Sequence, residues 1–229
     1  METLSPAAEH THTIIFLHGR DSVAKEFADE FFESEDSGPK TLPDRFPSVK
    51  WVFPTAELLQ STRFDCETSQ WFDMYSTEDP HENEDAQELA SSISRIQDLV
   101  AREAAIIGHE NVFLGGISQG CAVAIHALLG GQERLGGFIG LCSWLPKREA
   151  VKGVDGTANQ AIKTPILLCH ARDDDVINIS FGEELRDTLA SIGMKPRWCE
   201  YADGGHWVNE PQGVDDIVAF LKDAGVPSK

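Results

Sequence analysis

The chain is poor in positive charge and has no long apolar run. Its 229 residues include 19 lysines and arginines against 38 aspartates and glutamates, a formal net charge of −19. Such an acidic surface repels the phosphates of nucleic acids and anionic lipid head groups, so we expect neither as a partner. No stretch approaches the roughly 20 apolar residues of a transmembrane helix, and the polar residues 1–13 lack the apolar segment of a signal peptide. We therefore expect a cytoplasmic protein with no stable membrane anchor.

Cysteine is also scarce and follows no ligand pattern. The five cysteines are an odd number, they form no C-x-x-C pair, and no His/Cys cluster has the spacing of a zinc site. Four of them, Cys121, Cys142, Cys169 and Cys199, lie in apolar or strand-like runs, which suits reduced thiols in a core. The sequence therefore predicts neither a metal site nor a disulfide framework.

Short apolar runs alternate with helical patterns along the chain. This alternation is typical of an α/β fold with a mostly parallel sheet and helices on both faces. The clearest helix is expected at residues 86–107, where apolar residues recur every three or four positions. The length suits one domain over residues 1–229, with residues 1–12 as a flexible segment. Strands are expected at residues 13–17, 51–53, 112–115, 137–142, 166–170 and 197–201.

One segment points to nucleophilic chemistry. Residues 116–120 read Gly-Ile-Ser-Gln-Gly, between an apolar run at 111–115 and a buried-helix pattern at 121–129. A serine in this position lies on a sharp strand-to-helix turn, and glycines two residues away on each side leave room for that turn. A chance match is the alternative in a chain with 19 glycines, so the surrounding pattern must support the motif. Here the strand and helix patterns do, and Ser118 is predicted to be a nucleophile.

A serine nucleophile needs a base, and the base needs an orienting carboxylate. In a strand–turn–helix hydrolase the acid and then the histidine follow the serine, each after a later strand. His206 follows the strand pattern at 197–201 and two glycines, which predicts that it is the base. The strand pattern at 166–170 leads into Asp173, Asp174 and Asp175, and the pattern alone leaves the choice among these three open.

These motifs together make the chain resemble the acyl-protein thioesterase and carboxylesterase family, small α/β-hydrolases without a separate lid domain. The resemblance covers about residues 13–223 and implies an α/β-hydrolase fold. In the family the acid stands before a short apolar pair, which implies Asp174. The motifs that carry the resemblance are Ile-Phe-Leu-His-Gly at 15–19, Trp-Phe-Asp at 71–73, Leu-Gly-Gly-Ile-Ser-Gln-Gly at 114–120, Cys-Ser-Trp-Leu-Pro at 142–146, and the segments 169–177 and 201–206.

The resemblance also implies an oxyanion hole formed by the backbone N–H groups of Gln119 and Arg20. At the second position the chain departs from the family, which has His-Gly-Leu-Gly-Asp where this chain reads His-Gly-Arg-Asp-Ser at 18–22. The Arg20 side chain either turns to solvent or a nearby aspartate, or it recognises an anionic substrate group. Measuring Arg20→Leu on neutral and anionic esters separates these alternatives.

By resemblance the chain hydrolyses acyl esters or thioesters, of small molecules or of S-acylated proteins, with no metal or organic cofactor. One alternative is a specialised hydrolase for a small metabolite ester, for which the altered Arg20 loop would select an anionic substrate. Another is a non-catalytic ligand-binding protein, which the presence of all three triad residues disfavours. Six apolar residues either line an acyl groove or pack in the core: Trp71, Phe72, Met74, Trp144, Leu145 and Trp207.

Overall fold

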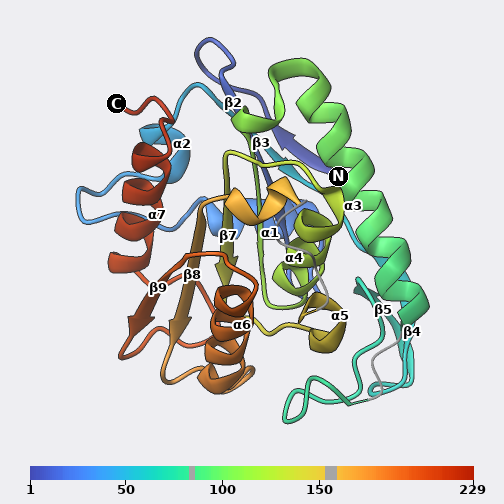
Figure 1. The fold of residues 1–229 in the computed structure, drawn as a ribbon. Coiled ribbons are helices and arrows are strands. Elements are labelled where there is room, and N and C mark those ends of the chain that lie inside the picture. Colours follow the sequence, from blue (N-terminus) through green and yellow to red (C-terminus); the bar gives the residue numbers. More distant parts are fainter. Residues whose placement is uncertain (83–85, 153–158) are drawn as a thin grey trace.

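The computed structural model describes residues 1–82, 86–152 and 159–229, and its centre is a seven-stranded sheet (Figure 1). The strand order is β1-β3-β2-β6-β7-β8-β9, in which β1 is antiparallel to β3 and every other neighbouring pair is parallel. The strands are β1 (Glu2–Leu4), β2 (His12–Leu17), β3 (Val49–Phe53), β6 (Val112–Ile117), β7 (Gly137–Leu141), β8 (Ile166–Ala171) and β9 (Pro196–Tyr201). All six predicted strands are present, so the mostly parallel sheet is confirmed.

Two features of the strand arrangement were not predicted. Residues 1–12 are expected to be a flexible segment, but Glu2–Leu4 pair with the edge of β3, and the terminal ammonium donates to Thr55 Oγ1 at 2.9 Å. A three-residue strand is too short to show an apolar pattern, and it forms only through hydrogen bonds to its partner strand. The other feature is a separate two-stranded antiparallel sheet formed by β4 (Glu57–Ser61) and β5 (Cys66–Gln70).

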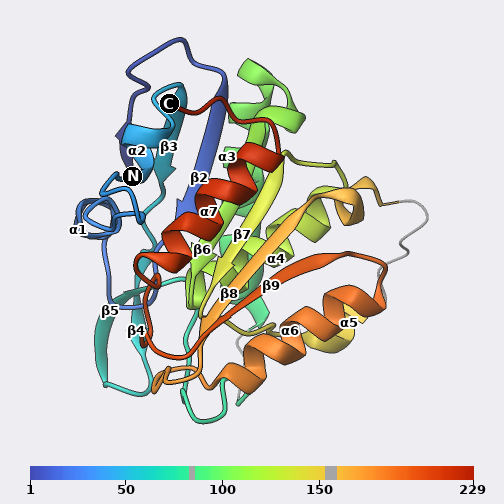
Figure 2. The ribbon, with the colours of Figure 1, turned by 90° about the vertical axis from the view of Figure 1, so that its left-hand side faces the viewer.

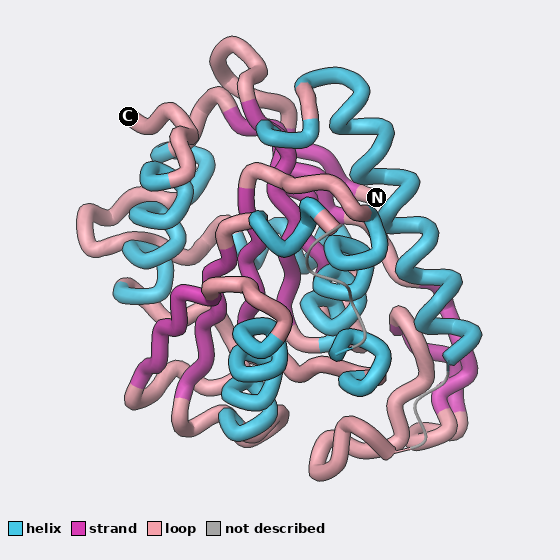
Figure 3. The backbone as a smooth tube through the Cα atoms, viewed as in Figure 1, coloured by secondary structure: helices cyan, strands magenta, loops and turns pink. Residues whose placement is uncertain are grey.

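Helices cover both faces of the main sheet, as predicted (Figures 2 and 3). Side chains alternate between the faces of a strand, so in β2 Ile15 and Leu17 join one core and Ile14 and Phe16 the other. Helices α3, α4 and α6 pack on the first face, and α1, α2 and α7 on the second. The helices are α1 (Ala24–Phe31), α2 (Leu42–Arg45), α3 (Ala86–Ile107), α4 (Gln119–Gly131), α5 (Arg148–Lys152), α6 (Ile179–Ser191) and α7 (Gln212–Asp223).

The predicted helix at 86–107 has the same limits in the structure, where it is α3. Its Leu89 and Ile96 are buried, while Ile93 and Val100 pack partly buried against the same core. Among the described residues, no helix combines the length and the apolar character needed to cross a bilayer.

The parallel arrangement determines where a site can form. Strands β2, β6, β8 and β9 run in the same direction, so the loops that follow them emerge at one edge of the sheet. These loops carry the residues singled out by sequence. Four segments that are far apart in the chain therefore meet above the carboxyl end of β6.

Candidate active site

Ser118 lies at a strained turn between β6 and α4. Its φ of 53° and ψ of −125° lie outside the regions that L-residues ordinarily adopt. A Cβ at Gly116 would lie 2.8 Å from the carbonyl oxygen of Leu17, and one at Gly120 would lie 2.4 Å from that of His18. Both contacts are with backbone that cannot move aside easily. The two glycines are therefore required for the turn to pack against β2.

Hydrogen bonds to neighbouring strands hold this turn in place. The N–H of Ser118 donates to the carbonyl of Leu141 at 2.9 Å, and the hydroxyl of Ser143 donates to the carbonyl of Ser118 at 2.7 Å. A strained conformation persists only where its surroundings hold it, and here β7 and the residues after it do so. The Ser118 hydroxyl is thereby kept at the mouth of a cavity.

The carboxylate of Asp174 is surrounded by four hydrogen-bond donors. Its Oδ1 accepts the backbone N–H groups of Val176 and Ile177, both at 2.9 Å. Its Oδ2 lies 2.8 Å from Nδ1 of His206 and 3.1 Å from Nε2 of His170. Burial alone would raise the pKa of the Asp174 carboxyl, but the hydrogen bonds from the two imidazoles hold that pKa well below its ordinary value. Asp174 is therefore an anion at neutral pH.

The other two aspartates of the run point elsewhere. Asp173 accepts the backbone N–H of Gly205 at 2.9 Å, and Asp175 is exposed. Of the three candidates, Asp174 is thus the one whose carboxylate meets His206.

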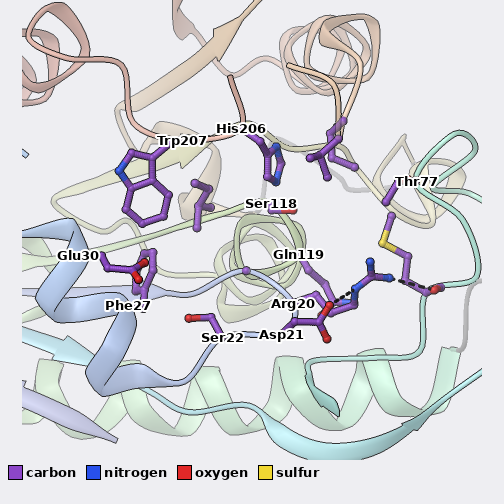
Figure 4. Close-up of a pocket in the computed structure, with 15 residues that line it drawn as sticks. Arg20, Asp21, Ser22, Phe27, Glu30, Thr77, Ser118, Gln119, His206 and Trp207 are labelled. Carbon is purple, nitrogen blue, oxygen red and sulfur yellow. Dashed lines mark hydrogen bonds and ion pairs between the residues drawn. The ribbon is translucent and has the colours of Figure 1, made fainter. Parts of the chain in front are cut away.

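His206 sits on the loop after β9, where Gly204 and Gly205 have φ values of 124° and 62°. Because its Nδ1 faces the carboxylate of Asp174, that nitrogen carries the proton and Nε2 is the free acceptor. The ring lines the same cavity as Ser118 (Figure 4). The imidazole is thus oriented by a carboxylate on one side and open to the cavity on the other.

His170 is a contact of Asp174 that the sequence did not reveal. It is the last residue but one of β8, its side chain is fully buried, and its Nε2 lies 2.9 Å from the carbonyl of Ile177 as well as 3.1 Å from Asp174. Both neighbours are acceptors, so Nε2 carries a proton and donates. A Cβ on Gly182 of α6 would lie 2.4 Å from its Nδ1, so glycine leaves room for the ring. The signal in the sequence that could have indicated this contact is the position of His170 four residues before Asp174.

On the opposite side of Ser118, Gln119 anchors the first turn of α4. Its side-chain Oε1 accepts the N–H of Trp71 at 2.8 Å and its Nε2 donates to the carbonyl of Phe72 at 2.7 Å. The indole of Trp71 in turn donates to the carbonyl of His18 at 2.9 Å. The backbone N–H of Gln119 opens the helix, so it has no intrahelical acceptor and is available to a ligand. Trp71 and Phe72 therefore hold the backbone around Ser118.

The ring of His18 holds the loop after β2. Its Nδ1 lies 2.6 Å from the carbonyl of Gly19, and its Nε2 accepts the N–H of Ala56 at 3.1 Å. Burial lowers the pKa of the His18 imidazole, which keeps the ring neutral. A neutral ring can act as both donor and acceptor here, as these two contacts require.

The guanidinium of Arg20 is occupied by protein groups. Its Nε lies 3.3 Å from Asp21 Oδ2, its Nη1 donates to the carbonyl of Met74 at 3.3 Å, and its carbon lies 5.0 Å above the ring centre of Phe64. The side chain is only 13% exposed, and burial lowers the pKa of the guanidinium. Of the two alternatives for Arg20, the structure has it paired with the nearby aspartate.

The cavity above Ser118 has a volume of about 270 Å³. Of the six apolar residues considered for an acyl groove, Met74 and Trp207 line it. The other four, Trp71, Phe72, Trp144 and Leu145, are at most 1% exposed and pack in the core. Core and groove residues are equally apolar, so the sequence could not separate them. The cavity lining also includes Arg20, Phe27, Glu30, Thr77, Val176 and Ile177.

One group of side chains has the composition of a metal site. In the described part of the chain, Cys142, Asp174 and His206 offer ligand atoms within 4.8 Å of one another. Cys142 is a buried thiol that lies 3.4 Å from the carbonyl of Trp207, and burial raises the pKa of this thiol well above its ordinary value. A protonated thiol that donates to the backbone next to His206 supports the loop rather than offering a ready ligand.

The chain is similar to known proteins along almost all of its length. The sequence model described as phospholipase/carboxylesterase matches residues 1–224. Acyl-protein thioesterase 1 of Yarrowia lipolytica is 31% identical over 220 residues, which cover 94% of this chain and 93% of the relative. Acyl-protein thioesterase 1 of Cryptococcus neoformans is 29% identical over 96% of this chain and 95% of the relative.

Solved structures show the same fold. Acyl-protein thioesterase 2 of Zea mays superposes with a TM-score of 0.81 at 24% identity and covers 97% of each chain. SOBER1 of Arabidopsis thaliana superposes with a TM-score of 0.79 at 23% identity, over 93% of this chain and 99% of that one. With these neighbours the fold is that of the α/β-hydrolases, as the sequence predicts.

Proposed function

This chain belongs to the phospholipase/carboxylesterase family, and from that premise we propose that Ser118, Asp174 and His206 form a catalytic triad that cleaves acyl esters and thioesters. The observation that carries the proposal is the contact between Asp174 Oδ2 and His206 Nδ1, at 2.8 Å, beside the cavity that holds the strained Ser118. An oriented imidazole and a serine on a sharp turn are the two parts that serine acyl transfer needs.

In the proposed reaction His206 takes the proton of Ser118 while the serine oxygen attacks the acyl carbonyl. The buried anion of Asp174 stabilises the imidazolium that forms and keeps its ring in the required tautomer. His206 then gives the proton to the departing alcohol or thiol, leaving an acyl group on Ser118. A water molecule, activated by the same imidazole, releases the acid and restores the hydroxyl.

The negative oxygen of the tetrahedral intermediate needs hydrogen-bond donors. We assign this role to the backbone N–H groups of Gln119 and Arg20. The first opens α4, and the second lies on the loop that His18 and Trp71 hold in place. Each such donor contributes about 3 kcal/mol to the stability of the transition state in comparable enzymes.

We assign the acyl chain to the wall of the cavity formed by Met74, Val176 and Ile177. This wall is apolar, and the relatives named acyl-protein thioesterase support a thioester among the substrates. The five free cysteines, one of them exposed, suit the reducing cytoplasm in which we place the protein.

The test is hydrolysis of p-nitrophenyl esters from acetyl to palmitoyl, and of an acyl thioester, by the wild type and Ser118→Ala. We expect the substitution to lower kcat by at least about 10⁴-fold, since it removes the nucleophile. Labelling with a fluorophosphonate followed by mass spectrometry should place the adduct on Ser118. Ser22→Ala is the matched control, because Ser22 lines the same cavity. Activity retained by Ser118→Ala, or an adduct on Ser22, would contradict the proposal.

A further inference from the structure

The two ends of the cavity differ in charge. Figure 4 shows Phe27, Glu30 and Trp207 on one side of Ser118, and Arg20 and Thr77 on the other. We call Phe27, Glu30 and Trp207 the α1 subsite, because the first two residues belong to α1. The charge of the opposite end is balanced by the ion pair that Arg20 makes with Asp21 at 3.3 Å.

Glu30 leaves the α1 subsite with an unbalanced negative charge. Glu30 is exposed and lines the cavity, and within the described residues its carboxylate makes no hydrogen bond or ion pair. The net charge of −19 adds a negative field over the whole molecule. A cavity wall with an unpaired carboxylate attracts a cation and repels an anion.

Aromatic rings complete the same subsite. Phe27 and Trp207 meet edge to face, with ring centres 5.7 Å apart and an angle of 81° between their planes. Trp207 is partly exposed to the cavity, and among the described cations none lies over its ring. Tryptophan has the strongest attraction for cations among the aromatic side chains, and an aromatic wall next to a carboxylate suits an organic ammonium.

The chemistry of the triad determines which part of a substrate reaches this subsite. His206 must donate a proton to the departing alcohol or thiol, so the leaving group lies on the side of its imidazole. Trp207 follows His206 directly in the chain, and both line the cavity. The apolar acyl chain then lies toward Met74, away from Glu30. The leaving group is the part that meets the α1 subsite.

We propose that the α1 subsite binds a positively charged group on the leaving alcohol or thiol, so that the protein prefers esters and thioesters with a cationic leaving group. This inference rests on the proposed function, which it makes more specific. It also disfavours the anionic metabolite ester considered from the sequence, since the one cation on the cavity wall among the described residues is already paired with Asp21.

The test compares S-butyrylthiocholine with its uncharged carbon isostere, S-(3,3-dimethylbutyl) thiobutyrate. The ammonium also makes thiocholine a better leaving group, so the informative quantity is the change in the kcat/KM ratio of the two substrates between variants. Glu30→Gln should lower this ratio about two- to fivefold, the effect of losing one exposed ion pair while the ring of Trp207 stays in place. Glu26→Gln, on the same helix and outside the cavity, should leave the ratio unchanged.

A second pair of substrates identifies the source of the cation. The two substrates are short peptides with an S-butyryl cysteine, one with lysine next to the cysteine and the other with norleucine in its place. If Glu30→Gln loses the preference within the thiocholine pair, the subsite binds a small ammonium. If it loses the preference within the peptide pair, the subsite binds a basic peptide. If Glu30→Gln changes neither ratio, the inference is overturned.

The two proposals fail in different ways. If the wild type cleaves the uncharged thioester and Ser118→Ala does not, the proposed function is supported whatever the kcat/KM ratios show. If neither thioester is cleaved, the proposed function fails, and binding of choline, followed by tryptophan fluorescence, tests the subsite alone. Saturable binding by the wild type that weakens in Glu30→Gln supports the subsite, and equal signals from both proteins exclude it.

Discussion

The two halves of the site are held in different ways. Ser118, Asp174 and His206, which we call the triad side, each follow a strand of the central sheet, and much of what positions them is backbone hydrogen bonding. The loop side, around Arg20, follows β2 but depends on side chains. Gln119, Trp71 and Arg20 itself reach across to groups from distant segments.

This difference has a chemical consequence. Backbone contacts within a sheet tolerate many side chains, so beside its reacting residues the triad side depends on few others: the glycines at 116 and 120, His170 and Ser143. The loop side depends on particular side chains, and there the chain departs from the family pattern by having Arg20 at the proposed oxyanion position. We expect substitutions of the reacting residues Ser118, Asp174 and His206 to affect mainly the reaction rate. Those on the loop side should affect stability and rate together.

The largest effect is expected for Asp174→Asn. The amide would favour the wrong tautomer of His206, and we expect kcat to fall about 10⁴-fold while the protein stays folded. Asp173→Asn is the control, because among the described residues Asp173 accepts only the N–H of Gly205. Asparagine keeps an oxygen that can accept this N–H, so kcat should fall less than about tenfold. Equal losses in steady-state kinetics of the two variants would mean that Asp174 is not the orienting acid.

His170→Leu should lower the stability of the protein on the triad side. It removes a buried hydrogen bond to the charged Asp174, which we expect to lower the free energy of unfolding by about 2–3 kcal/mol at neutral pH. Because the pKa of Asp174 is depressed in the folded protein, its contribution to stability is present above the ordinary value of about 4 and is lost as pH falls below it.

With a smaller depression in His170→Leu, stability should fall less steeply as the pH drops below about 4. Urea unfolding at a series of pH values measures this slope. His170→Gln keeps an N–H donor and should restore part of the stability and of the slope. A wild-type slope in His170→Leu would show that His170 does not act on Asp174.

On the loop side, Trp71→Phe keeps an aromatic ring but removes the N–H that donates to the carbonyl of His18. A buried acceptor left without a partner should lower the stability by about 1–3 kcal/mol, and kcat should fall with it. Trp144→Phe is the matched control, because Trp144 is equally buried and its indole N–H has no hydrogen-bond partner among the described residues. In thermal unfolding and in kinetics, Trp71→Phe should therefore lose more stability and more kcat than Trp144→Phe. Similar losses in both variants would contradict a special role for Trp71.

Arg20→Leu is expected to have the smallest effect. It removes the ion pair with Asp21, one hydrogen bond to Met74 and the contact with Phe64, together about 1–2 kcal/mol of stability. Neutral and anionic esters should lose kcat/KM by the same factor, because the guanidinium already has protein partners. Arg63→Leu, a second arginine over the same ring, is the control. A loss confined to anionic esters would restore the anion-recognition hypothesis.

Much of the fold could be predicted because its signals are local. The six parallel strands and α3 have apolar patterns of their own, and the turn at Ser118 has a glycine on each side. The β4–β5 hairpin was missed because its strands bury little apolar surface and pair mainly with each other. The strand β1 was missed because three residues hold no pattern.

The parallel sheet, the turn that presents Ser118 and the strand ends that carry the candidate acid and base can be read from the chain, because these depend on residues close together in it. The packing of distant segments is what makes His170 share Asp174 with His206, pairs Arg20, and brings Glu30 to the cavity beside Trp207. Those contacts join residues whose types are compatible with many environments. Which environment each one meets depends on how distant segments pack, and no local pattern records that.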